Sequence, residues 1–119
     1  MKILIAEDDY DLRTIVSDLL EARGFQTALA ADGEEALERA LGEGPQLIIL
    51  DLSMPKIDGF TVLRRLREMP QTLKTPVIAF TAHALKGDAQ KSLDAGFDAY
   101  VAKPFRPEDL LAEIQRLLK

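Results

Sequence analysis

Leu47-Ile48-Ile49-Leu50 is an unbroken run of four large apolar residues, and it ends at the carboxylate of Asp51. A strand that is covered on both faces needs apolar side chains at every position, so this run is typical of a buried strand in a parallel sheet. Four further short apolar runs are expected to form strands, and they cover residues 3–6, 27–30, 77–80 and 99–102. The sequence therefore predicts a sheet of five short strands.

The segments between these runs place their apolar residues at the spacing of an amphipathic helix. One set lies between the first two runs and another follows the fifth: Leu12, Ile15, Val16, Leu19 and Leu20, then Leu110, Leu111, Ile114, Leu117 and Leu118. Gly24 and Gly96 stand where a left-handed residue ends a helix. Asp32, with Glu35 three residues later, predicts a capped helix start, and Pro107 suits a first helical position.

Expected strands and helices alternate strictly along the chain. Such alternation predicts a parallel sheet with right-handed crossovers and helices on both faces. A closed eight-stranded barrel needs about twice this chain length. We therefore predict a single α/β domain over residues 1–119, an open, doubly wound sheet of five parallel strands with five helices.

Composition disfavours several classes of protein. The chain carries 15 Lys and Arg against 20 Asp and Glu, a net charge of −5, which disfavours direct binding to nucleic acid or anionic lipid. With no cysteine, it has neither a disulfide scaffold nor a thiolate zinc site. It shows no signal-peptide pattern and no apolar run near the ~18 residues of a membrane span. We therefore expect a soluble, cytoplasmic protein that binds no membrane.

Polar residues follow four of the five apolar runs. In an open parallel sheet a ligand binds beyond the carboxyl ends of the strands, so these side chains are expected at one crevice. They are, in chain order, Glu7, Asp8, Asp9, Asp51, Thr81 and Lys103. Each also has a structural explanation, because Asp8 or Asp9 would cap the first helix well. Asp51 can equally be a loop carboxylate, and Lys103 a solvated side chain.

Three aspartates in one crevice, Asp8, Asp9 and Asp51, favour a bound cation. Two carboxylates about 4 Å apart repel by roughly 4 kcal/mol at an effective dielectric of 20, and without a cation they raise one another's pKa. Mg²⁺ binds through one or two carboxylates and completes its coordination with water and a phosphate oxygen. Lys103 supplies a point charge for a phosphoryl oxygen, and Thr81 supplies a hydrogen-bond donor. The group therefore predicts a phosphoryl site.

In this order along the chain, the residues resemble the receiver domain of two-component response regulators. The matching segments are Glu7-Asp8-Asp9, DLSMPKIDG from Asp51 to Gly59, Thr81-Ala82 and Lys103-Pro104, with Tyr100 just before the last. The likeness extends from Met1 to Lys119. It implies the flavodoxin-like fold with strand order 2-1-3-4-5.

The resemblance also implies how a metal and a phosphoryl group would be held. Asp51 would be the phosphoacceptor. Asp9 and Asp51 would ligate Mg²⁺ directly, together with the backbone carbonyl of Ser53, and Asp8 would act through a bound water. Mn²⁺ would substitute for Mg²⁺ at such a site.

Three further residues take roles from the same resemblance. Lys103 would pair with the phosphoryl group, and the Thr81 hydroxyl would bond one of its oxygens. Thr81 would then swing toward the phosphate while the Tyr100 ring turns inward. The Lys103–Pro104 bond would be cis, in a tight turn that aims Lys103.

A receiver of this kind implies particular partners. Its phosphoryl group would come from a phosphohistidine on a histidine kinase or phosphotransfer protein. Phosphorylation would alter the surface formed by the fourth helix, the fifth strand and the fifth helix, which a downstream protein would read. Such a protein catalyses its own phosphorylation and dephosphorylation and is not a general-turnover enzyme. We expect a monomer or a weak phosphorylation-dependent dimer, either as a stand-alone regulator or as the receiver of a longer chain.

Two other functions stay open from the residues alone, an inactive receiver-like interaction module and a metal-dependent phosphohydrolase. Phosphohydrolases that form an aspartyl phosphate need a second acid two residues after the nucleophile, where this chain has Ser53. His83, the only histidine, lies in an expected loop and is interpreted as a solvated or rim residue. Arg64, Arg65 and Arg67 are expected on the outer face of the third helix.

Overall fold

The computed structural model describes residues 1–82 and 88–118, with only the backbone described at 88 and 89. Strands and helices alternate through the described part of the chain. In order they are β1 (Lys2–Ala6), α1 (Tyr10–Glu21), β2 (Gln26–Ala30), α2 (Gly33–Glu43), β3 (Leu47–Asp51), α3 (Gly59–Arg67), β4 (Val77–Thr81), α4 (Asp88–Ala95), β5 (Ala99–Ala102) and α5 (Pro107–Leu117). Each strand predicted from the sequence is present, with its ends moved by one residue at most.

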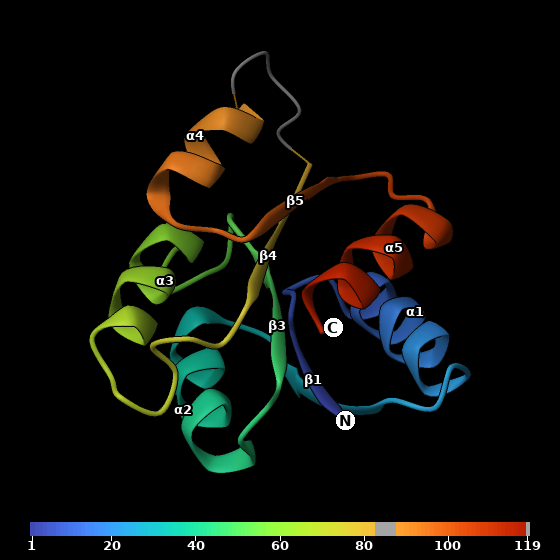
Figure 1. The fold of residues 1–119 in the computed structure, drawn as a ribbon, viewed down its shortest axis with the longest axis horizontal. Coiled ribbons are helices and arrows are strands. Elements are labelled where there is room, and N and C mark those ends of the chain that lie inside the picture. The colour runs from blue at the N-terminus through green and yellow to red at the C-terminus, as the bar shows by residue number, and fades with distance from the viewer. Residues whose placement is uncertain (83–87, 119) are drawn as a thin grey trace.

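All four strand pairings are parallel, and the strands lie in the order β2-β1-β3-β4-β5. Figure 1 shows α1 and α5 on one face of the sheet and α2, α3 and α4 on the other. The predicted α/β class, the doubly wound parallel sheet and the strand order 2-1-3-4-5 are therefore confirmed. Because β1 and β3 are central, the loops that follow them lie together at one edge of the sheet.

Two apolar cores flank the sheet, and successive strand residues contribute to them in turn. In β3, Ile48 and Leu50 pack toward α2 and α3, whereas Leu47 and Ile49 pack toward α1 and α5. Every residue of β3 and of β4 is buried. This explains why these strands are uniformly apolar, and it leaves the strand ends as the place where polar groups reach solvent.

Most helix and turn signals predicted from the sequence are confirmed. Gly24 and Gly96 have φ values of 90° and 111°, in the left-handed region that a side chain would strain. Asp32 caps α2 by accepting the backbone N–H of Glu35 at 2.8 Å. Pro107 begins α5, and the Lys103–Pro104 peptide bond is cis as expected.

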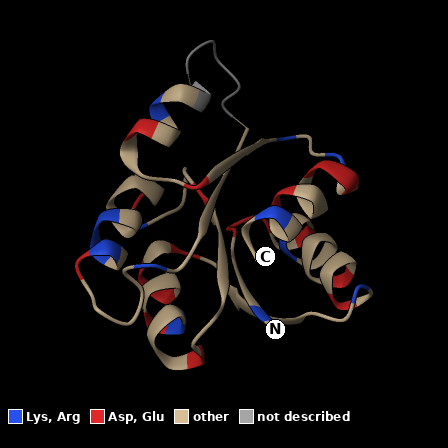
Figure 2. Ribbon diagram, in the orientation of Figure 1, with Lys and Arg blue, Asp and Glu red and all other residues tan. Residues whose placement is uncertain are grey.

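The arginines of α3 depart in part from the prediction. Arg64 and Arg65 are exposed on the outer side of the helix, where Figure 2 shows basic residues. Arg67 is not solvated in this way. Its guanidinium donates to the carbonyls of Thr72, Leu73 and Thr75 and pairs with Asp98 at 3.0 Å, so the predicted outward position of Arg67 was wrong.

Among the described residues, no helix combines the length and the apolar character needed to cross a bilayer. His83 and the loop around it lie outside the described residues, so the interpretation of His83 as a solvated or rim residue stays a prediction.

Candidate functional site

Each of the four strands β1, β3, β4 and β5 delivers one polar side chain to the same edge of the sheet. Glu7 follows the last residue of β1, Asp51 ends β3 and Thr81 ends β4, and all three are buried. Lys103 follows β5, and its side chain is only 15% exposed. The predicted meeting of strand-end residues at one crevice therefore holds for these four residues.

Lys103 bridges two of these strand ends. Its Nζ lies 2.5 Å from Glu7 Oε1 and 3.4 Å from Asp51 Oδ2. The same ammonium stands 5.1 Å from the centroid of the Phe80 ring, which is fully buried. The backbone N–H of Lys103 donates to the carbonyl of Thr81 at 2.8 Å. The main-chain bond and the Phe80 ring together orient the ammonium toward the carboxylates. The alternative that Lys103 is a solvated side chain is therefore wrong.

The acidic group consists of Glu7, Asp8 and Asp51. One oxygen from each carboxylate lies within 4.8 Å of the other two. Among the described residues, Lys103 is the only cation that forms an ion pair with this group, so one ammonium faces three carboxylates. Oxygen ligands with an excess of negative charge suit a hard divalent cation such as Mg²⁺. The donor set therefore fits the metal that the sequence implied.

Burial, together with the hydrogen bonds and charges inside this group, alters the protonation of its members. Burial raises the pKa of Glu7 from 4.5 to about 7, although hydrogen bonds from Lys103 and from the Asp9 N–H oppose the rise. The neighbouring charge of Asp51 adds to it. Burial also acts to raise the pKa of Asp8, but side-chain hydrogen bonds from Glu7 and Asp51 outweigh burial and leave that pKa below its ordinary value. Glu7 therefore holds its proton to a higher pH than Asp8 does, as expected for closely spaced carboxylates.

Asp9 occupies a different place from the one that the resemblance implied. Its carboxylate caps α1, accepting the backbone N–H of Leu12 at 3.2 Å. An aspartate at the residue just before a helix is a common N-cap, which the sequence offered as the alternative for Asp8 or Asp9. The geometry therefore favours Glu7 and Asp8, in place of Asp8 and Asp9, as the acidic pair beside Asp51. Glu7 was recognisable as the first polar residue after β1.

The loop after β3 holds Asp51 in a fixed orientation. The backbone N–H of Ser53 donates to Asp51 Oδ1 at 3.0 Å, which leaves Oδ2 facing Lys103. Gly59 begins α3 so close to this loop that a Cβ there would lie 2.7 Å from the Asp51 carbonyl oxygen. Only glycine allows that approach, which explains the glycine that closes the DLSMPKIDG segment.

Thr81 and Tyr100 lie on the same side of the sheet. Tyr100 is half-buried and packs against the core on the α2–α3 side, where Ala79 also lies. Thr81 is two residues beyond Ala79, so strand alternation brings it to this side as well. In the register of β4 and β5, Thr81 pairs with Ala102, two residues from Tyr100. The two residues are therefore diagonal neighbours on adjacent strands.

Comparisons with known proteins agree with this arrangement. Residues 3–115 match the family described as the response regulator receiver domain. The alkaline phosphatase synthesis transcriptional regulatory protein PhoP of Bacillus subtilis is 38% identical over 118 residues, which are 99% of this chain and 48% of that protein. The chain therefore spans about half the length of this curated relative.

Two solved structures have nearly the same backbone. The receiver domain of the Francisella response regulator 1452 superposes with a TM-score of 0.90 at 33% identity, covering 98% of this chain and 94% of that one. The receiver domain of the sensor histidine kinase PA1611 from Pseudomonas aeruginosa, described with a magnesium ion coordinated in its active site cleft, gives 0.89 at 34%, covering 98% and 95%. The fold defines a doubly wound α/β domain with an acidic group at its strand ends, and the chain belongs to the response regulator receiver family.

Proposed function

We propose that this protein is a phosphorylation-dependent signalling switch in which Asp51 accepts a phosphoryl group in a Mg²⁺-dependent reaction. The observation that carries the proposal is the position of Lys103 between Glu7 and Asp51 in a group of three carboxylates. A structural ion pair would match charges one to one. Here one ammonium, Lys103, lies among three carboxylates, so negative charge is in excess. We propose that Asp51 accepts the phosphoryl group and that Lys103 and a divalent cation balance the charge.

The transfer is an in-line displacement by the Asp51 carboxylate. A carboxylate oxygen forms a bond to phosphorus as the bond to the donor's imidazole nitrogen breaks, and the imidazole leaves with the electron pair. Ser53 holds one Asp51 oxygen through its backbone N–H, so the carboxylate does not rotate freely. Lys103, already 3.4 Å from the other oxygen, can turn to a phosphoryl oxygen as negative charge arrives.

Glu7, Asp8 and Asp51 are the residues that would hold Mg²⁺, with the carbonyl of Ser53 as a further ligand from the same loop. When bound, the metal supplies charge neutralisation for the phosphoryl oxygens and for the crowded carboxylates. Mn²⁺ is proposed to substitute for it, because it accepts the same oxygen ligands. The magnesium ion described for the PA1611 receiver supports this assignment.

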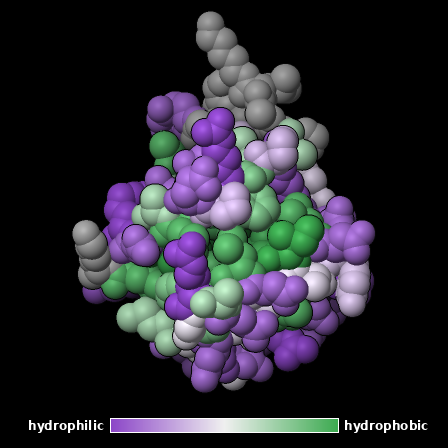
Figure 3. Space-filling model, turned by 90° about the vertical axis from the view of Figure 1, so that its right-hand side faces the viewer, coloured by the Kyte–Doolittle hydropathy of each residue, from purple (hydrophilic) through white to green (hydrophobic). Residues whose placement is uncertain are grey.

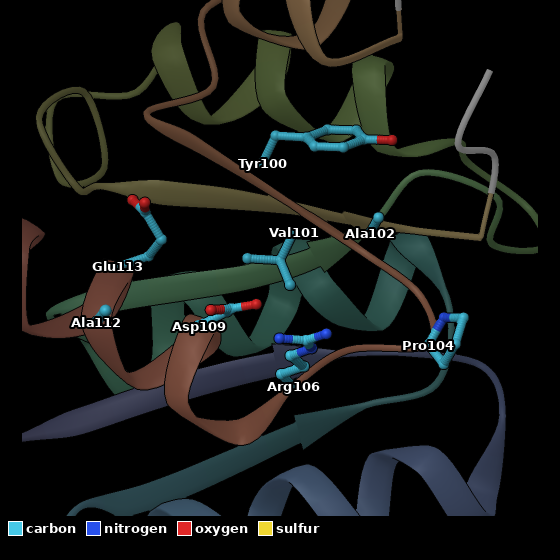
Figure 4. A pocket seen from close by; sticks show the side chains of 8 residues that line it. All are labelled: Tyr100, Val101, Ala102, Pro104, Arg106, Asp109, Ala112 and Glu113. Atoms are coloured by element: carbon cyan, nitrogen blue, oxygen red, sulfur yellow. The ribbon is translucent and has the colours of Figure 1, made fainter. Parts of the chain in front are cut away.

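The signal is proposed to pass from Thr81 to Tyr100. Their diagonal placement on β4 and β5 supports coupled motion, since a hydroxyl drawn to the phosphate vacates space beside the Tyr100 ring. Tyr100 also borders a hollow of 420 Å³ between β5 and α5 (Figure 4), lined on the α5 side by Asp109 and Glu113. A downstream protein reading the α4–β5–α5 surface would contact this hollow, so movement of Tyr100 would change what it binds.

The phosphoryl donor is proposed to be a histidine kinase or a histidine phosphotransfer protein. A hollow of 510 Å³ opens next to Lys103 and is lined by Pro104 and Phe105 and by Leu12 and Ile15 of α1. Ile15 is 55% exposed, and Figure 3 shows an apolar patch on this side of the molecule. A partner helix that rests on these apolar side chains would bring a phosphohistidine to Asp51.

Intact mass tests the proposal directly. The wild type and Asp51→Asn are incubated with acetyl phosphate or phosphoramidate, with and without Mg²⁺. We expect one phosphoryl mass in the wild type that requires Mg²⁺ and is absent in the mutant. No gain in the wild type would favour an inactive interaction module, and a gain that survives in Asp51→Asn would show another acceptor. We further propose a cytoplasmic protein that turns over only its own phosphoryl group, as a monomer or a weak phosphorylation-dependent dimer.

A further inference from the structure

Arg13 of α1 makes a contact that the proposed transfer does not yet use. Its guanidinium Nη1 donates to the main-chain carbonyl of Glu7 at 2.7 Å. That carbonyl belongs to the peptide that joins Glu7 to Asp8, the two acids that stand beside Asp51. Arg13 therefore binds the backbone between Glu7 and Asp8, two of the three side chains proposed to hold the metal.

The carbonyl that Arg13 binds lies just beyond the sheet. The backbone N–H of Glu7 still pairs with the Ala30 carbonyl of β2 at 3.0 Å, as a continuing strand would. One residue later the chain turns toward α1, and the N–H of Asp9 donates to the Glu7 carboxylate at 3.1 Å. The Glu7 carbonyl needs its own partner at this bend, because an unpaired buried carbonyl is costly.

The position of Arg13 runs against the usual preference for charges on a helix. It is the fourth residue of α1, and a cation near a helix N-terminus is disfavoured by the helix dipole. Helix side chains lean toward the N-terminus, so Arg13 can reach back over the first turn to the β1–α1 loop. In the described part of the chain it forms no ion pair, although Asp9 and Asp11 are close in sequence. Its guanidinium instead binds the Glu7 carbonyl and lies over the Tyr10 ring, with Cζ 5.5 Å from the ring centroid.

We infer that Arg13 is a positioning residue that fixes the Glu7–Asp8 peptide and so presents both carboxylates to the divalent cation. This inference rests on the proposed function, and it concerns the support of the ligands, not the ligands themselves. Groups behind metal ligands commonly set affinity by about 10–100-fold, because they remove the freedom that a ligand would lose on binding. A charged donor on the peptide also draws electron density toward the carbonyl and counters the crowding of three carboxylates.

The test compares two arginines that make the same bond in different places. Arg116 of α5 also donates to a main-chain carbonyl, that of Asp98 at 3.1 Å. Asp98 precedes β5, so this bond lies at the end of the sheet opposite to the acidic group. Arg13→Met and Arg116→Met each remove one guanidinium-to-carbonyl bond and keep an unbranched side chain. Arg116→Met also removes the ion pair with Glu113 at 2.6 Å, which lies outside the acidic group. Mg²⁺ affinity of the folded proteins is measured by calorimetry, and thermal unfolding verifies that each variant is folded.

We expect the Kd for Mg²⁺ to rise about tenfold in Arg13→Met and to stay unchanged in Arg116→Met. Arg13→Lys keeps a charged donor and recovers most of the affinity. In metal-free protein, amide hydrogen exchange at Asp8 and Asp9 becomes several-fold faster in Arg13→Met only. Equal Mg²⁺ affinity in Arg13→Met and wild type, or equal losses in both methionine variants, would overturn the inference.

Failure of the proposed function gives a different pattern. If the wild type neither binds Mg²⁺ nor takes up a phosphoryl group, the switch proposal is wrong, whatever Arg13 does. The metal-free exchange measurement still decides whether Arg13 holds the peptide, and unchanged exchange in Arg13→Met would contradict that role.

Discussion

Two cations lie against opposite ends of the same sheet, and their surroundings differ in charge balance. Arg67 lies near the amino ends of β4 and β5, where it meets one carboxylate, Asp98. Lys103 lies beyond the carboxyl ends of the strands, where it meets the group of Glu7, Asp8 and Asp51. The first environment is balanced and the second carries excess negative charge.

In the cluster of Arg67, Asp98 and the loop after α3, the one cation is matched by one carboxylate. Besides the three carbonyls that Arg67 binds, Asp98 Oδ2 accepts the backbone N–H of Val77, the first residue of β4, at 2.8 Å. The loop after α3 is thereby tied to the starts of two strands. Such a cluster stabilises the fold and has no use for a ligand.

The Lys103 cluster is left incomplete by the fold itself. Burial raises the pKa of Glu7 to about 7, and the neighbouring charge of Asp51 adds to the rise, so Lys103 does not offset the cost of burying the Glu7 carboxylate. A divalent cation and a phosphoryl group would complete it. An excess of negative charge therefore distinguishes the ion cluster around Lys103, which we propose to be functional, from the structural cluster around Arg67.

The largest effect is expected from pH. Because the pKa of Glu7 in the folded protein, about 7, exceeds its ordinary value of 4.5, the folded state binds this proton more tightly. Stability of the metal-free protein should therefore fall as the pH rises through the window between these values, by about 3 kcal/mol. Urea unfolding at pH 5 and pH 8 without Mg²⁺ measures the change.

Glu7→Gln serves as the control for the pH experiment, since it keeps the side-chain shape but cannot titrate. We expect its unfolding free energy to vary much less between pH 5 and pH 8. An undiminished pH dependence in Glu7→Gln would assign the titration to another group and remove the imbalance from the Lys103 cluster.

At the balanced end, Arg67→Met should lower the free energy of unfolding by about 2 kcal/mol, because it leaves Asp98 and several carbonyls without their charged donor. Mg²⁺ affinity and phosphoryl uptake should not change, since the acidic group lies at the other end of the strands. Chemical denaturation and calorimetry measure the two quantities. A large loss of Mg²⁺ affinity would show that the two ends are not independent.

At the Lys103 end of the sheet, Asp51→Asn should raise the free energy of unfolding, whereas Arg67→Met lowers it. It removes one of three crowded carboxylates and keeps an acceptor for the Ser53 N–H, so the metal-free protein should gain about 1 kcal/mol of stability. Stabilisation by added Mg²⁺ should shrink at the same time. Thermal unfolding with and without Mg²⁺ tests both statements, and a destabilised mutant would mean that Asp51 is as well matched as Asp98.

The smallest effect is a change of signal. Thr81→Ala should still take up a phosphoryl group at Asp51, but Tyr100 should respond less. The chain has no tryptophan and two tyrosines, so in a Tyr10→Phe background tyrosine fluorescence reports on Tyr100 alone during phosphorylation. An unchanged fluorescence response in Thr81→Ala would argue against coupling of these residues.

Much of the fold was predictable because it depends on local patterns. The apolar runs at 47–50 and 77–80 specify buried strands, and each lies within one residue of the observed strand. The positive φ of Gly24 and Gly96 and the cap at Asp32 follow from the chemistry of single residues. Strand order came from the resemblance, since no local pattern encodes which strands are neighbours.

The site was predictable in kind but not in every ligand. Acids after β1 and β3 and a lysine after β5 were expected at one crevice, and Glu7, Asp51 and Lys103 do meet there. The sequence could not tell which of three consecutive acids turns inward. That depends on where the strand ends and α1 begins, and on the capping bond that the Leu12 N–H donates to Asp9, which directs the Asp9 carboxylate to the helix.

By itself the sequence determined the alternation of strands and helices, the apolar cores and the chemical class of the site, because each depends on residue type and spacing. Only the tertiary structure decided the partners of individual charges. Arg67 and Lys103 are both cations near strand ends, yet one is neutralised and the other is outnumbered. Pairing of charges is a long-range property, because it depends on which loops the sheet order brings within a few ångströms of one another.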